Sequence, residues 1–278
     1  EVDTKYKMLL DRLDKSEKEK EAILGMKNSI DTFSITKVSS SSSEATAFMI
    51  ASDWHIEEEV KPQTINGLNK FNLSIAEKRA SAFFTNGLRL CDIVKKDIKI
   101  SNLVVALLGD FISNNIHDEL MEINLLSPVE AVIKVQNMIV SGIQYLMDNS
   151  DLTLTIVCSF GNHGRTTRDR RNATEAGNSL EFFMYHILAN HFRDNERVKF
   201  VIGEGYHTYL DVYSKTIRFH HGHNLRYAGG IGGIFVPAYK AIAQWNKMKR
   251  SDLDVFGHFH QSKDGGNFVC NGSLIGYN

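Results

Sequence analysis

Short apolar runs alternate along this chain with longer amphipathic segments. Aspartate, asparagine or histidine follows most of these runs. Apolar strands are expected at 47–51, 103–108 and 152–160, with amphipathic helices at 75–93 and 128–147 between them. Alternation of strands and helices is typical of sheets that are covered by helices. The sequence therefore predicts an α/β fold.

The second half of the chain continues this pattern with shorter elements. In chain order, we expect a helix at 174–193, a strand hairpin at 208–213 and 216–219, a helix at 237–248, and strands at 254–256 and 267–270. Ser127 followed by Pro128 is a typical helix start, which supports the boundary of the 128–147 helix.

The N-terminal part of the chain has a different composition. Residues 1–31 are rich in Lys and Glu, and their apolar residues fit an interrupted heptad seam. We expect a helical extension over 1–38, with a surface helix favoured over an arm for self-association or partner binding. Five consecutive serines predict a flexible linker, assigned to 39–45, before a main domain at 46–278. Because the chain begins at Glu1 and not at Met, we expect it to be part of a longer protein or a processed product.

The charge balance excludes some classes of protein. The chain has 32 Lys and Arg against 33 Asp and Glu, for a formal net charge of −1. This argues against coating nucleic acid or anionic membrane by bulk charge, although a local basic groove remains compatible with it. No apolar run approaches the roughly 18 residues of a membrane span, so no membrane partner is expected. The three cysteines form no CxxC pair, which favours a reducing, cytoplasmic location.

Residues of metal-binding type collect where the predicted strands end. In chain order the endings are Asp53-Trp54-His55, Gly109-Asp110, Gly161-Asn162-His163, His220-His221-Gly222-His223 and Gly257-His258-Phe259-His260. Ligands bind at the carboxyl ends of strands in α/β proteins, so these endings are expected to converge. Imidazole, carboxylate and amide groups without thiolate suit Mn, Fe, Zn or Co. One such histidine is more often structural, but five clusters together predict a shared metal centre.

In this order, the motifs Asp-x-His, Gly-Asp, Gly-Asn-His, His-Gly-His and Gly-His-x-His resemble those of the calcineurin-like metallophosphoesterases. The resemblance covers roughly residues 46–275 and includes Asn271-Gly272-Ser273, which is similar to a stretch that often closes the family's core. It implies a four-layer αββα sandwich, the metallophosphoesterase fold, with two divalent metal ions between the sheet edges. Manganese is favoured, and iron, zinc, cobalt and nickel are the alternatives.

The resemblance also implies a role for each matching residue. The implied ligands are Asp53, His55 and His260 for one metal, Asn162, His221 and His258 for the other, and Asp110 for both. A hydroxide that bridges the metals would attack phosphorus, and His163 would protonate the leaving group as a general acid. The chain departs from the family at Gly164, where an Asp or Glu usually follows the Asn-His pair, and Asp169 is a candidate replacement.

Several residues are candidates for substrate contact. Four arginines lie among the seven residues 165–171, just after the predicted catalytic histidine, and arginine recognises phosphate oxygens well. The candidates are Arg165, Arg168, Arg170, His223 and Asn114. The alternative for the arginines is a solvated loop without contact to substrate. The glycine-rich segment Gly229–Gly233 is either a mobile flap over the site or a tight packing turn. We expect Arg218 and Arg226 to extend the positive rim, and Tyr239 to lie in the core.

These observations favour a metal-dependent nuclease, similar to phage-encoded and repair-nuclease members of the family, with DNA or RNA as substrate. A phosphatase or a nucleotide phosphodiesterase that acts on small phosphoesters is the alternative within enzymes, and the balanced charge fits it equally well. A metal-binding scaffold without activity is the alternative of another class, and Gly164 is the feature that keeps it open.

Overall fold

The computed structural model describes residues 33–37, 43–227 and 229–278. The expected extension over 1–38 and the linker over 39–45 therefore lie largely outside the described residues. Where they are described, both contain strand: Ser34–Ile35 forms β1, and Glu44–Ala51 forms β2. The compact main unit begins at Ser34, earlier than expected, because β1 pairs in parallel with the strand Thr208–Val212 (β6).

One sheet consists of four parallel strands in the order β2-β3-β4-β5. The other three strands are Lys99–Leu107 (β3), Thr153–Cys158 (β4) and Val198–Ile202 (β5). The ends of β3 and β4 are buried on both faces, which explains their unbroken apolar sequence. The three strands expected in this half of the chain are confirmed, and β5 is an addition that was not predicted.

The other sheet has six strands in the order β1-β6-β7-β8-β10-β9 and mixes parallel with antiparallel pairs. Its remaining strands are Lys215–Phe219 (β7), Leu253–Phe256 (β8), Lys263–Asp264 (β9) and Phe268–Cys270 (β10). β6 and β7 form the expected hairpin, with Tyr213 in the left-handed region at its turn. The predicted strands of this half are confirmed.

The four helices expected in the main domain are present. The helices of the described residues are Pro62–Ile65 (η1), Leu73–Val94 (α2), Asp118–Ile123 (α3), Pro128–Asp148 (α4), Ala176–Asn178 (η2), Leu180–His191 (α5) and Phe235–Trp245 (α6). Of these, α3 and the two short helices η1 and η2 were not predicted. Ser127 caps α4 in a reciprocal pair with Glu130, as its sequence indicated. The helix expected from residue 174 begins at Leu180 instead, because Ser179 caps it by accepting from the backbone N–H of Phe182.

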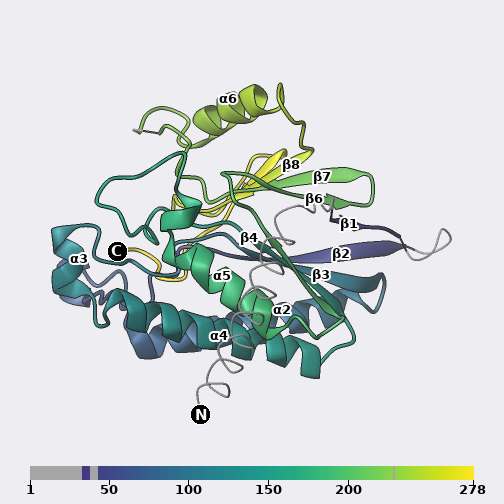
Figure 1. The fold of residues 1–278 in the computed structure, drawn as a ribbon, viewed down its shortest axis with the longest axis horizontal. Helices are drawn as coiled ribbons and strands as arrows, with labels where there is room; N and C mark the ends of the chain where they lie inside the picture. Colours follow the sequence, from purple (N-terminus) through teal and green to yellow (C-terminus); the bar gives the residue numbers. More distant parts are fainter. Residues whose placement is uncertain (1–32, 38–42, 228) are drawn as a thin grey trace, which may run out of the picture. The chain divides into compact units, whose positions relative to one another are not determined.

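The two sheets lie face to face, and helices cover their outer faces (Figure 1). Helices α2, α4 and α5 pack on the four-stranded sheet, and α6 packs on the six-stranded sheet. Between the sheets, the rings of Phe48 and Phe219 stack 6.5 Å apart, and Thr46 donates a hydrogen bond to Tyr213. The fold is therefore mixed α/β, as predicted. Within the described part of the chain, no helix combines the length and the apolar character needed to cross a membrane.

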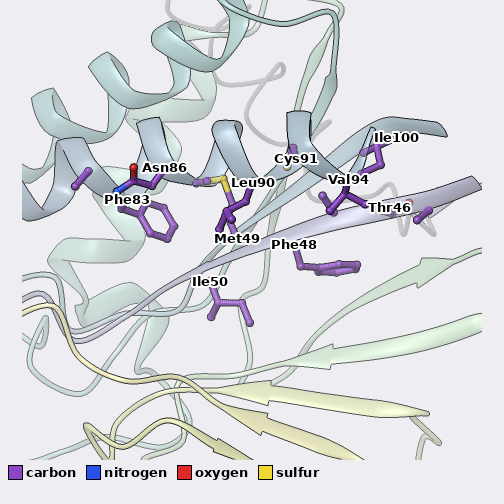
Figure 2. Close-up of a pocket in the computed structure, with 14 residues that line it drawn as sticks. Thr46, Phe48, Met49, Ile50, Phe83, Asn86, Leu90, Cys91, Val94 and Ile100 are labelled. Carbon is purple, nitrogen blue, oxygen red and sulfur yellow. The ribbon is translucent and has the colours of Figure 1, made fainter. Parts of the chain in front are cut away.

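An open, apolar groove of about 670 Å³ runs between the edge strand β2 and helix α2 (Figure 2). Phe48, Met49 and Leu90 are among the side chains that line it. None of the polar residues at the strand ends contributes to this groove. The groove and the polar strand ends are therefore separate features of the domain.

Candidate metal centre

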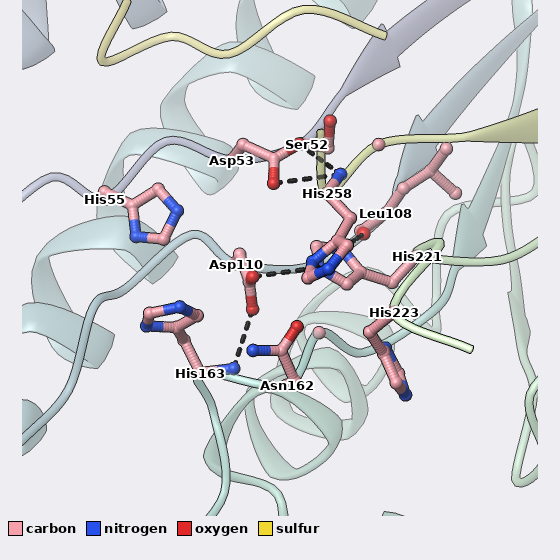
Figure 3. A network of polar contacts seen from close by, with 12 residues as sticks. Ser52, Asp53, His55, Leu108, Asp110, Asn162, His163, His221, His223 and His258 are labelled. Atoms are coloured by element: carbon pink, nitrogen blue, oxygen red, sulfur yellow. Dashed lines mark hydrogen bonds and ion pairs between the residues drawn. The ribbon is translucent and has the colours of Figure 1, made fainter. Parts of the chain in front are cut away.

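The loops that leave β2, β3, β4, β7 and β8 meet at one end of the two sheets (Figure 3). Backbone hydrogen bonds join neighbouring loops within each sheet: Asp53 N–H donates to Gly109 at 2.9 Å, and Gly257 N–H donates to His221 at 2.8 Å. The two sheets are joined through the carboxylate of Asp53, whose Oδ2 accepts from the backbone N–H of His258 at 2.9 Å. The expected convergence of the strand ends is thus present.

The predicted ligands have unusual backbone conformations. Of the eight non-glycine residues with positive φ in the described part of the chain, five are predicted ligands: Asp53, His55, Asp110, His258 and His260. Such conformations cost free energy and concentrate at functional sites, where the surrounding structure holds them in place. Here, the adjacent loops hold them.

Close approach of the loops requires glycine at two positions. A Cβ atom on Gly109, which has φ +85°, would lie 2.2 Å from the backbone nitrogen of Gly161. A Cβ atom on Gly161 would lie 2.1 Å from Oδ1 of Asp110. No larger residue fits at either position, so the two glycines allow the β3 and β4 loops to bring their polar residues together.

Asp110 lies at the centre of the cluster and is fully buried. Its Oδ1 accepts a hydrogen bond from the backbone N–H of His163 at 2.8 Å, and its Oδ2 lies 2.8 Å from Nε2 of His221. Burial alone would raise the pKa of Asp110, but His221 and His163 hold this pKa well below its usual range. Burial likewise opposes the charged form of His221, but Asp110 and Asp53 raise the pKa of His221 to about 10.

Three histidines have one ring nitrogen held by an oxygen atom outside the cluster. Nδ1 of His221 lies 2.7 Å from the carbonyl oxygen of Leu108, and Nδ1 of His163 lies 2.9 Å from that of Ser113. Nδ1 of His55 lies 2.9 Å from the hydroxyl of Ser113. Nδ1–H donation to these oxygens leaves Nε2 of each ring as the atom that can bind a metal ion, and Nε2 of His221 faces Oδ2 of Asp110.

Three sets of side chains could hold a metal ion, since their ligand atoms lie within 4.8 Å of one another. The sets are Asp53, His55 and His260; Asp110, His221 and His258; and His55, Asp110 and His163. The first two correspond to the ligand groups implied by the sequence. Asn162, the remaining predicted ligand, has a buried side-chain oxygen without a hydrogen-bond partner among the described residues. The assignment of each ligand to a particular metal stays a prediction.

Buried glutamates that were not predicted from the sequence support the site. Glu57 accepts hydrogen bonds from the backbone N–H groups of Ser113 and Asn114 at 2.7 and 2.8 Å. Glu58 accepts from the Ser113 hydroxyl, and so holds the group that contacts His55. Burial raises the pKa of Glu57 to about 7. Three consecutive glutamates at 57–59 match no metal-site motif, so the local sequence gave no sign of this role.

Glu181 lies beside Gly164, the position where the sequence differs from the motif of the family that it resembles. Its carboxylate accepts from the backbone N–H groups of Phe111 and Gly161, each at 2.7 Å, and so holds the loops on both sides of Asp110. A Cβ atom at Gly164 would lie 2.9 Å from Cγ of Glu181. Glycine is therefore needed there to make room for this glutamate. The carbonyl of Ser113 orients His163, in place of the carboxylate expected from Asp169.

Most of the predicted substrate contacts have partners within the protein. Arg165 donates to the carbonyl of Asn162, and Arg170 donates to the carbonyl of His223, both at 2.7 Å. Asn114 donates to the carbonyls of His163 and Arg165 at 2.9 and 2.7 Å. These hydrogen bonds fix the arginine loop to the site, and the predicted contact of these three side chains with substrate stays a prediction. Arg168 is exposed and remains a candidate for substrate contact.

His223 is buried beside the cluster, and its Nε2 lies 3.2 Å from Oε1 of Glu175. This close pair lacks hydrogen-bond geometry, since neither side chain has a hydrogen-bond partner among the described residues. Burial lowers the pKa of His223, although the neighbouring Glu175 opposes that change. His223 therefore contacts the arginine loop, while its predicted contact with substrate stays untested.

Other expectations near the site are wrong. Arg218 is completely buried and binds Asp254 through two nitrogens at 2.6 and 3.0 Å, so it contributes nothing to a positive rim. Tyr239, expected in the core, is 42% exposed. His117 is an additional residue beside the site, since its ring centroid lies 6.3 Å from that of His163. Only the fold brings these two rings together, so the sequence gave no signal for His117.

No family model and no curated protein matches the chain. A solved structure of a protein of unknown function from Aquifex aeolicus is similar, with 14% sequence identity and a TM-score of 0.32. The similarity covers 82% of this chain and 90% of that one. The geometry of the cluster is thus the basis for assigning a function.

Proposed function

We propose that this chain is a metal-dependent phosphoesterase of the calcineurin-like type, and that it hydrolyses phosphodiester bonds in nucleic acid. The observation that supports this proposal is the convergence, on one buried point between two sheets, of the residue types that bind divalent metals. The residues in question are Asp53, His55, Asp110, Asn162, His221, His258 and His260. Two facing sheets with helices outside them are compatible with the four-layer αββα sandwich of that family.

The donor set fits a pair of divalent cations. Nε2 of His55 and the side-chain oxygen of Asn162 are both buried, and neither has a hydrogen-bond partner among the described residues. An unpaired buried polar atom costs free energy, which a bound cation would recover. Nitrogen and oxygen donors without sulfur suit manganese, and also iron, zinc, cobalt or nickel.

Bound cations would supply Lewis acidity, which lowers the pKa of a water molecule and neutralises charge on phosphoryl oxygens. The chain's own residues supply orientation and a proton. Asp110 offers two oxygens in different directions, one toward His163 N–H and one toward His221. His163, fixed through Nδ1 by Ser113, presents its Nε2 as the general acid for the leaving oxygen.

Nucleic acid is favoured over small phosphoesters because two exposed arginines follow histidines of the site within a few residues of the chain. Arg168 follows His163 by five residues and is exposed, and Arg226 follows His223 by three and is also exposed. The scaffold alternative has less support than the sequence suggested, because a Cβ atom at Gly164 would lie 2.9 Å from Cγ of Glu181, which gives this glycine a structural reason. The small-ester alternative predicts turnover that is insensitive to Arg168→Ala.

The test is a panel of phosphoesters incubated with the protein and Mn²⁺, with EDTA as the negative control. The panel contains labelled single- and double-stranded DNA, RNA, and p-nitrophenyl phosphate mono- and diesters. We expect cleavage of nucleic acid that is lost in Asp110→Asn and retained in Asp252→Asn, which changes an exposed carboxylate of the same type. Hydrolysis of the monoester alone would favour a phosphatase, and full metal occupancy without any hydrolysis would favour the scaffold.

A further inference from the structure

An aromatic pair lies directly beside the candidate metal centre. Phe259 stands between His258 and His260 in the sequence, and its ring centroid lies 4.9 Å from that of His258. The ring of Tyr227 lies 5.9 Å from that of Phe259 at an interplanar angle of 74°. Tyr227 is 36% exposed, so the pair connects the edge of the cluster to the surface.

The loop that carries Tyr227 is anchored at the residues before it. The backbone N–H of Leu225 donates to the carbonyl of Gly222 at 2.9 Å, and the side chain of Leu225 is buried. Arg226 and Tyr227 follow this anchor, and both are exposed. An exposed cation and an exposed ring thus sit next to each other, a few residues from His221.

We propose that Tyr227, supported by Phe259, is a stacking platform for the nucleobase next to the phosphodiester at the metal centre. This inference rests on the proposed function and specifies its substrate: a strand whose bases are unpaired at the site. Stacking on an aromatic side chain strengthens binding of single-stranded nucleic acid by about five- to 150-fold per base. Arg226 supplies the positive charge that such sites place along the backbone.

A nucleobase fits this position better than another apolar group. The near-perpendicular contact with Phe259 leaves at least one face of the Tyr227 ring uncovered by it. A single exposed ring next to a cation offers too little apolar surface for a protein partner. A base has two flat faces and is linked through its sugar to the phosphate that the metal centre would bind. One nucleotide could therefore contact both the metal centre and the ring of Tyr227.

The test compares single-stranded DNA with the same strand carrying abasic sites, for both cleavage in Mn²⁺ and binding in EDTA. Binding is followed by the fluorescence of 2-aminopurine, which is quenched when the base stacks. The variants are Tyr227→Ala and Tyr227→Phe. Tyr239→Ala is the matched control, because Tyr239 is similarly exposed, at 42%, but contacts Phe235 and Phe268.

We expect wild type to prefer the base-bearing strand over the abasic strand by about tenfold. This preference should disappear in Tyr227→Ala and persist in Tyr227→Phe and Tyr239→Ala, with the same pattern in the 2-aminopurine quenching. If wild type cleaves both strands equally, or if Tyr227→Ala keeps the preference, the platform is wrong while the nuclease function stands. If wild type neither cleaves nor binds either strand, the nuclease function itself fails.

Discussion

Nε2 of His221 lies 2.8 Å from Oδ2 of Asp110, and this contact joins the two sheets of the fold at the candidate metal centre. Asp110 follows β3 of the four-stranded sheet, and His221 follows β7 of the six-stranded sheet. Both side chains are buried. Any change to this pair is therefore expected to affect metal binding and the contact between the sheets together.

Asp110→Asn removes the negative charge that faces His221 and, in the proposed site, both cations. We expect the affinity for Mn²⁺ to fall by at least the 10- to 100-fold that is common for a lost supporting group, about 1.4–2.7 kcal/mol. The measurement is a calorimetric titration of metal-free protein with Mn²⁺, with far-UV circular dichroism to check the fold. An unchanged affinity in a folded variant would show that Asp110 is not a ligand.

Gly164→Glu introduces the acid that is usual at this position in the family that the sequence motifs resemble, and we expect it to destabilise the protein. A Cβ atom at this position would lie 2.9 Å from Glu181 and 3.2 Å from the Ser179 hydroxyl, so the loops must move. The expected loss is about 1–3 kcal/mol of unfolding free energy, measured by urea denaturation. Gly177→Ala is the matched control, because a Cβ atom on Gly177 meets nothing within 4 Å. Equal stability of both variants would contradict the role given to Glu181.

Asp254→Ala leaves the buried guanidinium of Arg218 without its carboxylate. Removing one partner of a buried ion pair costs about 3–5 kcal/mol, because the other charge stays buried without compensation. Thermal denaturation should show a large decrease in Tm. Lys215→Ala, which breaks the exposed pair with Asp252, should have a much smaller effect. A similar decrease for both would mean that the buried pair contributes no special stability.

His207 gives a prediction for the pH dependence of stability. Burial, with the nearby His220 and Arg218, lowers the pKa of His207 to about 3 from 6.5. The unfolded chain therefore binds more protons than the folded one between these pKa values, so stability present above pH 6.5 is lost as the pH falls toward 3. His207→Gln should reduce the slope of unfolding free energy against pH in this window by at most about 1.4 kcal/mol per unit, and by less where water screens the ring. An unchanged slope from pH 6 to 4 would contradict this assignment.

Much of the fold follows from sequence patterns that depend on local chemistry. The strands β2, β3 and β4 each end in a continuous apolar run, and Ser127 with Glu130 specifies the start of α4. β5 was missed because its five residues include the exposed Lys199, which interrupts the apolar pattern. β1 was missed because a two-residue strand has no periodicity of its own.

The ligands could be predicted from the sequence because each one follows closely after a predicted strand, and the fold brings the ends of these strands together. The roles of the supporting residues could not be predicted from the sequence, since they depend on partners that are distant in the chain. Arg218 resembles a surface arginine until Asp254 is placed beside it, and Glu181 resembles an ordinary first-turn acid until Phe111 and Gly161 meet it. Tyr227 is a candidate for base stacking only because the fold places its ring beside that of Phe259.

The most direct test of the central claim is the number of Mn²⁺ ions bound per chain, measured by equilibrium dialysis with elemental analysis. Two ions per chain are expected for wild type. His55→Ala and His221→Ala, each of which removes a predicted ligand of a different ion, should each lower this number. His186→Ala, on α5 and in ring contact with Phe182, should leave it unchanged. Wild type that binds no Mn²⁺ and no other divalent transition metal would contradict the dimetal centre and the function proposed from it.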